Sequence, residues 1–190
     1  MSATTSSRES AVRALAEVFR EHGFDGASMA LLTEASGLGK GSLYHFFPGG
    51  KREMAQAVLD DVDAWFRGNL FAPLQEAATP ESARAAVESM FDAVEVYFRS
   101  GRRACLPGSF ALSRPRDLFT VAINDYFTEW IDALGSALEV AGIEGARSEA
   151  IRVVADIQGA IVLAHALDDS ETFTTVLEAS RGVLDPRPGS

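Results

Sequence analysis

The sequence predicts an all-α protein. Apolar residues recur at helical spacing along most of the chain, no stretch alternates apolar and polar residues as a half-buried strand does, and no hairpin signal separates such stretches. The expected architecture is an N-terminal domain of three helices, a connecting helix and a larger helical domain, with about nine helices in total.

The first two helices are expected to form part of a small module. An apolar stripe at helical spacing predicts a helix over residues 8–22, and Gly23 ends it. Ser28 is a good N-cap for a second helix, because its hydroxyl oxygen can accept an otherwise unpaired backbone N–H. Gly37 stands where the chain leaves that helix, and glycine adopts φ > 0 there without steric cost.

A third, short helix is expected over residues 40–46, directly after the turn at Gly37. The apolar residues that two steeply crossed helices would share are Leu32, Leu38, Leu43 and Phe46. The opposite face of the short helix is polar. A polar helix that protrudes from the protein surface fits the major groove of DNA, so the pattern predicts a DNA-binding helix-turn-helix.

The candidate DNA contacts follow from this placement. Lys40 and Lys51 are expected to neutralise phosphates, and Ser28 can offer a hydroxyl and the backbone N–H groups of a helix N-terminus. Gly41 allows the backbone to approach a base edge. The residues expected to contact bases or phosphates are Ser42, Tyr44 and His45. The alternative is that Tyr44 packs between helices and that His45 caps its own helix.

The run Lys40-Gly-Ser-Leu-Tyr-His-Phe-Phe-Pro-Gly-Gly-Lys51, with His22-Gly-Phe-Asp-Gly-Ala-Ser28 before it, resembles the signature of TetR-type one-component transcriptional regulators. The resemblance covers residues 8 to about 60. Pro48-Gly-Gly-Lys51 and Cys105-Leu-Pro-Gly-Ser-Phe-Ala-Leu112 look most like the LmrA/YxaF-like subgroup. The resemblance implies the same DNA-contact roles at the matching positions and an effector pocket among the later helices. The single cysteine, Cys105, excludes an intrachain disulfide and fits a reducing bacterial cytoplasm.

Two residues depart from the family pattern. The family often has Ser or Thr where this chain has Gly39, so the recognition helix has lost a capping side chain. A small residue is usual where Thr33 stands, so the packing there is less standard.

The net charge of −10 at first argues against a nucleic-acid binder. However, residues 1–52 hold six Arg/Lys and five Asp/Glu, whereas residues 53–190 hold the other 11 basic and 22 acidic groups. The acidic charge therefore lies outside the predicted DNA module, where it would repel phosphate and orient the basic end toward DNA. The simpler interpretation, that an acidic surface keeps the protein in solution, is compatible with this one.

The rest of the chain is expected to be helical, with breaks near Phe71-Ala-Pro73 and Ala78-Thr79-Pro80. Thr79 and Pro80 form a strong helix start. The later helices are predicted over residues 80–101, 115–140, 148–167 and 171–183. The predicted organisation is a disordered arm (1–7), a helix-turn-helix domain (8–52), a connecting helix (53–70), an effector-binding and dimerisation domain (71–184) and a frayed tail (185–190).

The last two helices suit a homodimer interface, because the helix over 148–167 is apolar almost all round and must be covered on both sides. Two such pairs can form a four-helix bundle. The alternative is a helix buried within one subunit. The interface candidates are Ile151, Val154, Ala155, Gly159, Val162, Ala166, Phe173, Val176 and Leu177.

The larger domain is rich in aromatic residues, which favours an apolar small-molecule site with a few polar groups. Core packing is the alternative for each single residue. The effector-site candidates are Phe91, Tyr97, Phe98, Cys105, Phe110, Tyr126, Phe127, Trp130 and His165.

Other classes of function have weaker support. The three histidines are far apart in sequence and show no metal-ligand spacing, no nucleophile elbow or phosphate-binding loop is present, and no run is long enough to cross a membrane. We therefore expect a non-enzymatic regulator with no cofactor or metal, whose partners are near-palindromic double-stranded DNA, a small effector and a second copy. The alternatives are a helical enzyme or interaction module, and a regulator that senses oxidation through Cys105, beside Arg103.

Overall fold

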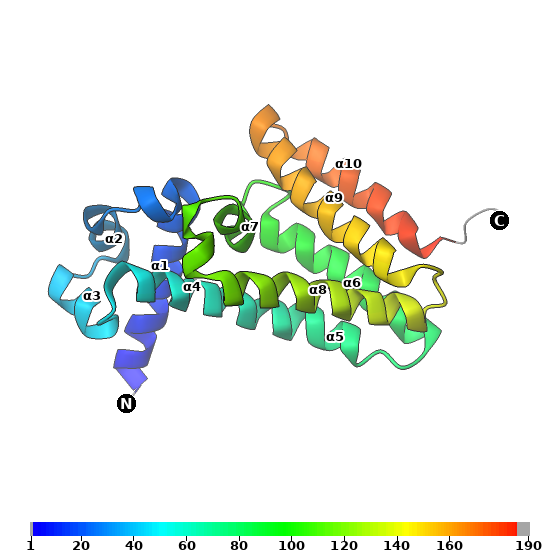
Figure 1. Ribbon diagram of the computed structural model, residues 1–190, viewed down its shortest axis with the longest axis horizontal. Coiled ribbons are helices and arrows are strands. Elements are labelled where there is room, and N and C mark those ends of the chain that lie inside the picture. Colours follow the sequence, from blue (N-terminus) through cyan, green and yellow to red (C-terminus); the bar gives the residue numbers. More distant parts are fainter. Residues whose placement is uncertain (1, 186–190) are drawn as a thin grey trace. The chain divides into compact units, whose positions relative to one another are not determined.

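A computed structural model describes residues 2–185, and within them the chain is helical almost throughout (Figure 1). The all-α prediction is confirmed. The chain divides into two compact units. The N-terminal unit contains the stretch ending at Ala64 together with Leu106–Asn124, and the C-terminal unit contains Trp65–Cys105 together with the stretch from Asp125 onward.

The N-terminal unit is built on α1, whose backbone leaves the helical conformation at Gly23 (φ 65, ψ 177), as the sequence predicts for the end of the first helix. Leu15 and Phe19 on α1 are fully buried and belong to the core of the unit. Its elements are α1 (Ser2–Gly26), α2 (Met29–Ser36), α3 (Lys40–Phe46), most of α4 (Gly50–Phe66), α7 (Leu106–Ala111), the 3-10 turn η2 (Arg114–Leu118) and the start of α8 (Thr120–Val140).

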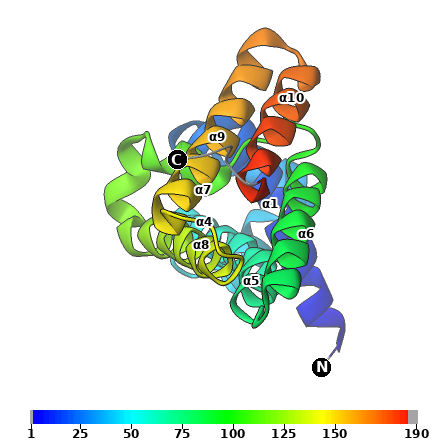
Figure 2. The same cartoon turned by 90° about the vertical axis from the view of Figure 1, so that its right-hand side faces the viewer.

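The C-terminal unit is a set of longer helices, of which α9 and α10 lie side by side (Figure 2). Thr79 caps α6 as predicted, and its hydroxyl accepts the backbone N–H of Ser82 at 3.2 Å. The elements are the π-helical turn η1 (Arg67–Phe71), α5 (Ala72–Gln75), α6 (Pro80–Phe98), the rest of α8, α9 (Ala146–Leu167), α10 (Ser170–Arg181) and the 3-10 turn η3 (Gly182–Leu184).

Arg181 fixes the end of α10 to α6. Its guanidinium lies 2.6 Å from Asp92 and 2.7 Å from Glu88, and 5.2 Å from the centroid of the Phe91 ring. Burial acts to lower the pKa of Arg181, but the hydrogen bonds that it donates to Asp92 and Glu88, together with the negative charges of Asp92 and Glu178, outweigh burial and raise that pKa above its usual value. The charge of Arg181 is therefore neutralised where the two helices meet.

Three boundaries differ from the sequence prediction. The chain stays helical through the expected break at Phe71-Ala-Pro73, because η1 precedes α5 and Pro73 falls in the first turn of α5, where no N–H is required. The helix expected from Pro115 begins at Thr120, after η2. The arm expected to be disordered is helical from Ser2. The expected tail, apart from Asp185, lies outside the described residues.

The most consequential difference concerns residues 106–124, which the sequence prediction places in the effector domain. They belong to the N-terminal unit, because Phe110 and Phe119 pack on the end of α1. The Phe110 and Phe119 ring centroids lie 6.2 Å and 5.5 Å from that of Phe24, and Phe110 also lies 6.2 Å from Phe19. We call Phe19, Phe24, Phe110 and Phe119 the aromatic joint.

Gly101 is the most closely packed glycine of the C-terminal unit. It has φ 83, and an added Cβ would lie 2.7 Å from the Cβ atoms of both Ala164 and Phe173. We predict that Gly101→Ala lowers the free energy of unfolding by about 3 kcal/mol, because it combines a strained backbone with overpacking. Urea denaturation followed by tryptophan fluorescence measures this, since Trp65 and Trp130 both belong to this unit.

Gly142→Ala is the matched control. Gly142 has a similar φ of 81, but an added Cβ meets nothing within 4 Å. Its cost should be limited to the backbone, about 1 kcal/mol. Equal decreases in the two variants would show that crowding at Gly101 contributes nothing.

Candidate nucleic-acid interface

The turn between α2 and α3 has the geometry that the sequence predicts. Gly37 adopts the left-handed conformation (φ 64, ψ 11), and its N–H donates to the carbonyl of Glu34 at 3.3 Å. Leu32 and Leu43 are fully buried between the helices, as expected. Phe46 is only half-buried, and Phe47, which the sequence prediction left out, takes the fully buried position instead.

The outer surface of α3 is polar and exposed. Lys40, Gly41, Ser42, Tyr44 and His45 are all exposed, as predicted for residues that meet DNA. Tyr44 has a double role, because its ring lies against the backbone of Gly50 while 41% of the residue is exposed. The Lys40 ammonium lies 6.0 Å from the centroid of the same ring. These side chains therefore present donors and acceptors on one short helix.

The two helices begin differently. The Ser28 hydroxyl accepts the backbone N–H of Leu31 at 3.3 Å, so α2 has the predicted N-cap. Gly39 provides no side-chain cap to α3, which agrees with the missing cap expected from the sequence. The N–H groups of the first turn of α3 consequently lack a capping side chain, next to the exposed Lys40 and Ser42.

Lys51, the other predicted phosphate contact, makes hydrogen bonds within its own chain. Its ammonium donates to the carbonyl oxygens of Phe24 at 2.8 Å and Asp25 at 3.4 Å, and lies 4.7 Å from the centroid of the Phe24 ring. The side chain is half-buried, in contrast to exposed Lys40. Lys51 is thus engaged with the backbone of its own chain, whereas the predicted contact residues of α3 are free to meet DNA.

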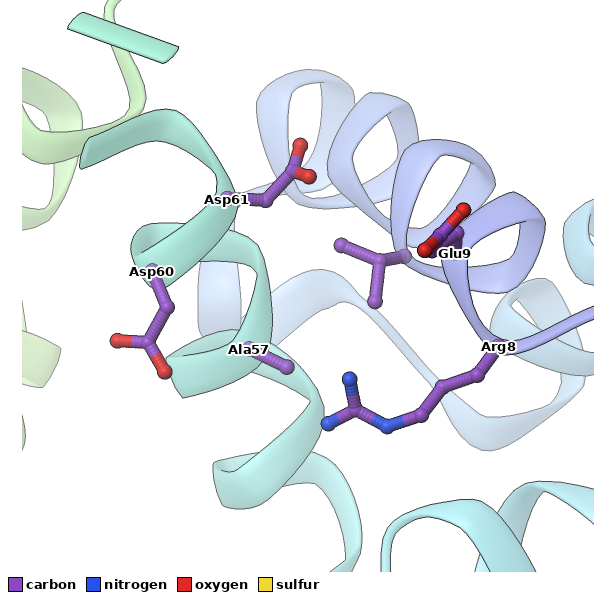
Figure 3. Close-up of a pocket in the computed structure, with 6 residues that line it drawn as sticks. Arg8, Glu9, Ala57, Asp60 and Asp61 are labelled. Atoms are coloured by element: carbon purple, nitrogen blue, oxygen red, sulfur yellow. The ribbon is translucent and has the colours of Figure 1, made fainter. Parts of the chain in front are cut away.

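A second candidate site, a cleft of about 220 Å³ within the N-terminal unit, lies between α1 and α4 (Figure 3). Arg8 and Glu9 line it from α1, and Asp60 and Asp61 from α4. Arg8 also lies 5.0 Å from the centroid of the Phe47 ring. Val12 and Ala57 complete the lining, and none of the predicted effector residues contributes to it, so this cleft is not the predicted effector site.

The aromatic cluster of the C-terminal unit is centred on Phe66, which the sequence prediction did not include. Its ring centroid lies 4.8 Å from Tyr97, 6.0 Å from Phe98, 5.0 Å from Tyr126 and 5.3 Å from Trp130. Phe66, Phe98, Tyr126 and Trp130 are at most 1% exposed. In this conformation the chain's own rings therefore fill the cluster. The paired aromatics Trp65 and Phe66 near the end of a predicted helix were the available sequence signal.

The other predicted effector residues are dispersed. Phe110 belongs to the N-terminal unit, as described above, and Phe91 contacts Arg181. His165 is exposed, and its Nδ1 lies 2.9 Å from the carbonyl oxygen of Ile161 on the same helix. Phe127 is half-buried beside Tyr126, and Cys105 is buried. The structure therefore brings together only part of the predicted set.

Helix α9 has two apolar faces. One face packs within the C-terminal unit, and Val154, predicted for the dimer interface, lies on it with 4% exposed. Phe173 and Leu177 of α10 are likewise buried, so these three residues belong to the core because the chain's own helices cover them. Val176 is half-buried. The exposed residues of the other face are Ile151, Ala155, Gly159, Val162, Leu163, Ala166 and Leu167.

Helix α9 is apolar on its exposed face as well as on its buried face. Among the described residues, Ala146–Leu167 is the one helix long and apolar enough to cross a membrane by length and composition, with 39% of the apolar window buried. A helix that packs against its own unit on one side and against a partner on the other can be as apolar as a membrane-spanning helix.

The fold and this site define a helix-turn-helix protein. Residues 11–58 match the family described as "Bacterial regulatory proteins, tetR family". The HTH-type transcriptional regulator LmrA of Bacillus subtilis is 34% identical over 73 residues, 38% of each chain. The uncharacterized HTH-type transcriptional regulator YxaF of the same organism is 38% identical over 55 residues, 29% of each chain. The matched stretches thus span well under two thirds of these relatives.

Similarity of fold extends over most of the chain. The crystal structure of a TetR-family transcriptional regulator from Agrobacterium tumefaciens aligns with a TM-score of 0.79 and 17% identity, covering 94% of this chain and 97% of that one. The resemblance to TetR-type transcriptional regulators seen in the sequence is therefore confirmed over residues 11–58, and the chain as a whole is similar in fold to a TetR-family regulator.

The Ser28 cap generates a test of how α2 is held. Ser28→Ala should lower the free energy of unfolding by about 1 kcal/mol, because the backbone N–H of Leu31 loses its acceptor. Ser28→Asp keeps an acceptor and should retain the stability of the parent protein. Thermal denaturation of the two variants distinguishes them, and a Ser28→Ala variant as stable as Ser28→Asp would show that the cap is dispensable.

Proposed function

We propose that the protein is a sequence-specific, DNA-binding transcriptional regulator that works as a homodimer and responds to a small molecule. The observation that carries the proposal is the polar, exposed surface of α3, presented by a helix whose other side is anchored by fully buried Leu43. In the bacterial cytoplasm, α3 would enter the major groove, and Lys40, Ser42, Tyr44 and His45 would contact phosphates and base edges.

The charge distribution supports this orientation on DNA. Residues 1–52 contain six basic and five acidic side chains, whereas the remainder of the chain contains 11 and 22. An acidic body repels the phosphate backbone and so disfavours non-specific docking through the wrong surface.

A second copy of the chain is the proposed partner of the exposed face of α9. One short recognition helix reads only a few base pairs, so useful specificity requires two helices on two half-sites. The face contains Ile151, Val162 and Leu167, which are 48%, 61% and 63% exposed. Two α9–α10 pairs would bury this apolar surface as a four-helix bundle, and the operator would be nearly palindromic.

The effector is proposed to be a small apolar or aromatic molecule that enters the cluster around Phe66, Tyr126 and Trp130. Because these rings leave almost no exposed surface, binding would displace side chains and thereby favour a different conformation of the helices. Release of the operator on effector binding, the typical behaviour of a repressor in this family, is the expected response.

The alternative functions have less support. Cys105 is only 6% exposed, which disfavours direct attack by an oxidant on its thiol. A helical enzyme or interaction module would leave the exposed polar surface of α3 without a role, and it predicts no sequence-specific protein–DNA complex. A regulator that senses oxidation through Cys105 would still bind its operator, but Cys105→Ser would make operator release insensitive to peroxide.

We predict tight binding of the purified protein to a near-palindromic segment in promoter-sized fragments from its own genomic neighbourhood. Lys40→Ala/Tyr44→Ala should weaken that binding at least about tenfold, because each side chain that contacts a phosphate or a base contributes about 1 kcal/mol or more. Footprinting at several salt concentrations makes the measurement. Weak, salt-erased binding without a footprint on any fragment would count against the proposal.

The dimer generates a separate prediction. Val162→Asp should convert the protein to a monomer at micromolar concentration, because it buries a charge without a partner in the interface. Val96→Asp is the matched control, since Val96 is also an exposed valine, on α6, and should leave a dimer. Light scattering on a sizing column reports both masses. A dimeric Val162→Asp protein would exclude this face of α9 as the interface.

A further inference from the structure

The π-helical turn η1 interrupts an otherwise continuous helix. The backbone is helical at Phe66 (φ −65, ψ −42) and again at Ala72 (φ −60, ψ −48), so α4, η1 and α5 follow one another without a break. At the end of η1 the N–H of Ala72 donates to the carbonyl of Arg67, five residues earlier, whereas an α-helical N–H donates to the fourth. Such wide turns are rare and are frequent at functional sites.

The sequence explains why the helix widens at this point. Pro73 has no N–H, and in a regular α-helix its ring would meet the carbonyl oxygen of Asn69, four residues earlier. A change of register directly before the proline relieves that clash. The side-chain amide of Asn69 also donates to the carbonyl oxygen of Trp65 at 2.7 Å, which stabilises the chain where the wide register begins.

The wide register decides which side chains face the aromatic cluster around Phe66. Residues five apart on an α-helix point about 140° away from each other, because each residue turns the helix by about 100°. A wide turn brings such residues to nearly the same side, and the ring centroids of Phe66 and Phe71 lie 6.0 Å apart. Phe71 also lies 6.2 Å from the Tyr126 ring and is fully buried. Phe71 therefore joins the cluster through the register of η1.

The same turn is held to α8. Arg67, the first residue of η1, forms an ion pair with Glu129 of α8, and Tyr126 of the same helix packs on the Phe66 ring. These residues all belong to the C-terminal unit, whereas most of α4 belongs to the N-terminal unit. The packing of the cluster, the register of η1 and the rotation of α4 thus depend on one continuous helix.

We propose that η1 is a two-register switch that connects the effector cluster to α4. While the Phe66 and Phe71 rings pack together, the turn keeps its wide register. An effector that separates the two rings removes the contact that favours this register, and the turn adopts α-helical hydrogen bonds. The two registers differ by about one residue, so the change rotates α4 about its own axis by up to about 100° relative to α5. This inference rests on the proposed function, because it concerns how an effector alters DNA binding.

Pro73→Ala tests the register directly. Alanine restores the N–H and removes the ring, so the variant should adopt the α-helical register without an effector. Amide hydrogen exchange over residues 67–72 should slow about tenfold, and thermal denaturation should show no loss of stability. Pro80→Ala is the matched control, since Pro80 stands in the first turn of α6, where no N–H is required. It should leave exchange over residues 67–72 unchanged.

Operator binding shows whether the register acts on α4. Pro73→Ala should weaken operator binding about tenfold in the absence of any ligand, because affinity falls with the fraction of protein in the binding-competent conformation. Pro80→Ala should bind as the wild-type protein does. Reduced affinity in a variant that is no less stable cannot arise from unfolding. Asn69→Ala, which removes the hydrogen bond to Trp65, should shift exchange and affinity in the same direction and serves if Pro73→Ala does not fold.

The connection to the cluster has a reciprocal test. If separated rings favour the α-helical register, that register favours separated rings by the same factor. The fluorescent aromatic probe anilinonaphthalene sulfonate should therefore bind Pro73→Ala several-fold more tightly than the wild-type protein or Pro80→Ala. Equal dissociation constants would show that the register and the cluster are independent, which would overturn the inference.

Two further results would also overturn it. Unchanged exchange over residues 67–72 in both Pro73→Ala and Asn69→Ala would show that η1 has a single register. Slower exchange with unchanged operator affinity would show that the register does not act on DNA binding. If the wild-type protein gives no footprint, slower exchange and tighter probe binding in Pro73→Ala would still support the two registers, and the missing footprint would count against the proposed function alone.

Discussion

The two helices of the helix-turn-helix, α2 and α3, are too short to be stable alone, so their conformation depends on packing against the rest of the N-terminal unit. Helices of eight and seven residues are marginal in water, because nucleation costs more than so few hydrogen bonds return. Their conformation therefore depends on the burial of Leu32, Leu43 and Phe47 beneath them. The turn at Gly37 keeps that small core closed while the opposite surface of α3 stays exposed.

The aromatic joint gives this core a support that is distant in sequence. Residues 106–124 pack on the end of α1 through Phe110 and Phe119, although the chain on either side of them belongs to the C-terminal unit. Residues 106–124 are covalently continuous with both α6 and α8. An effector that favours a new arrangement of either helix would therefore also shift this segment. Such an effect requires the ligand to bind two conformations with different affinities. Phe24 of the joint also accepts, through its carbonyl oxygen, a hydrogen bond from the ammonium of Lys51 on α4.

Helix α9 shows how one composition can serve two purposes. Val154 and its neighbours on one face pack in the core, whereas Ile151, Val162 and Leu167 remain exposed on the other. Apolar spacing in the sequence indicates a helix that is covered on both sides, but it does not say which residues face which partner. Val154, Phe173 and Leu177 were therefore expected at the interface, although the chain's own packing covers them. The assignment depends on the rotation of α9 against α10, which helical periodicity alone leaves open.

Local chemistry was enough to predict the all-α class, the helix-turn-helix, the caps at Ser28 and Thr79, and the polar face of α3. Each of these features depends on groups within a few residues of one another, such as a hydroxyl beside an unpaired N–H or a glycine at φ > 0. The packing of the helices was needed to show that Lys51 binds the carbonyl of Phe24, that Phe110 belongs to the N-terminal unit and that Phe66 is the centre of the aromatic cluster. Those contacts join residues far apart in the chain, and no local pattern records which distant side chain or carbonyl will be adjacent once the helices pack.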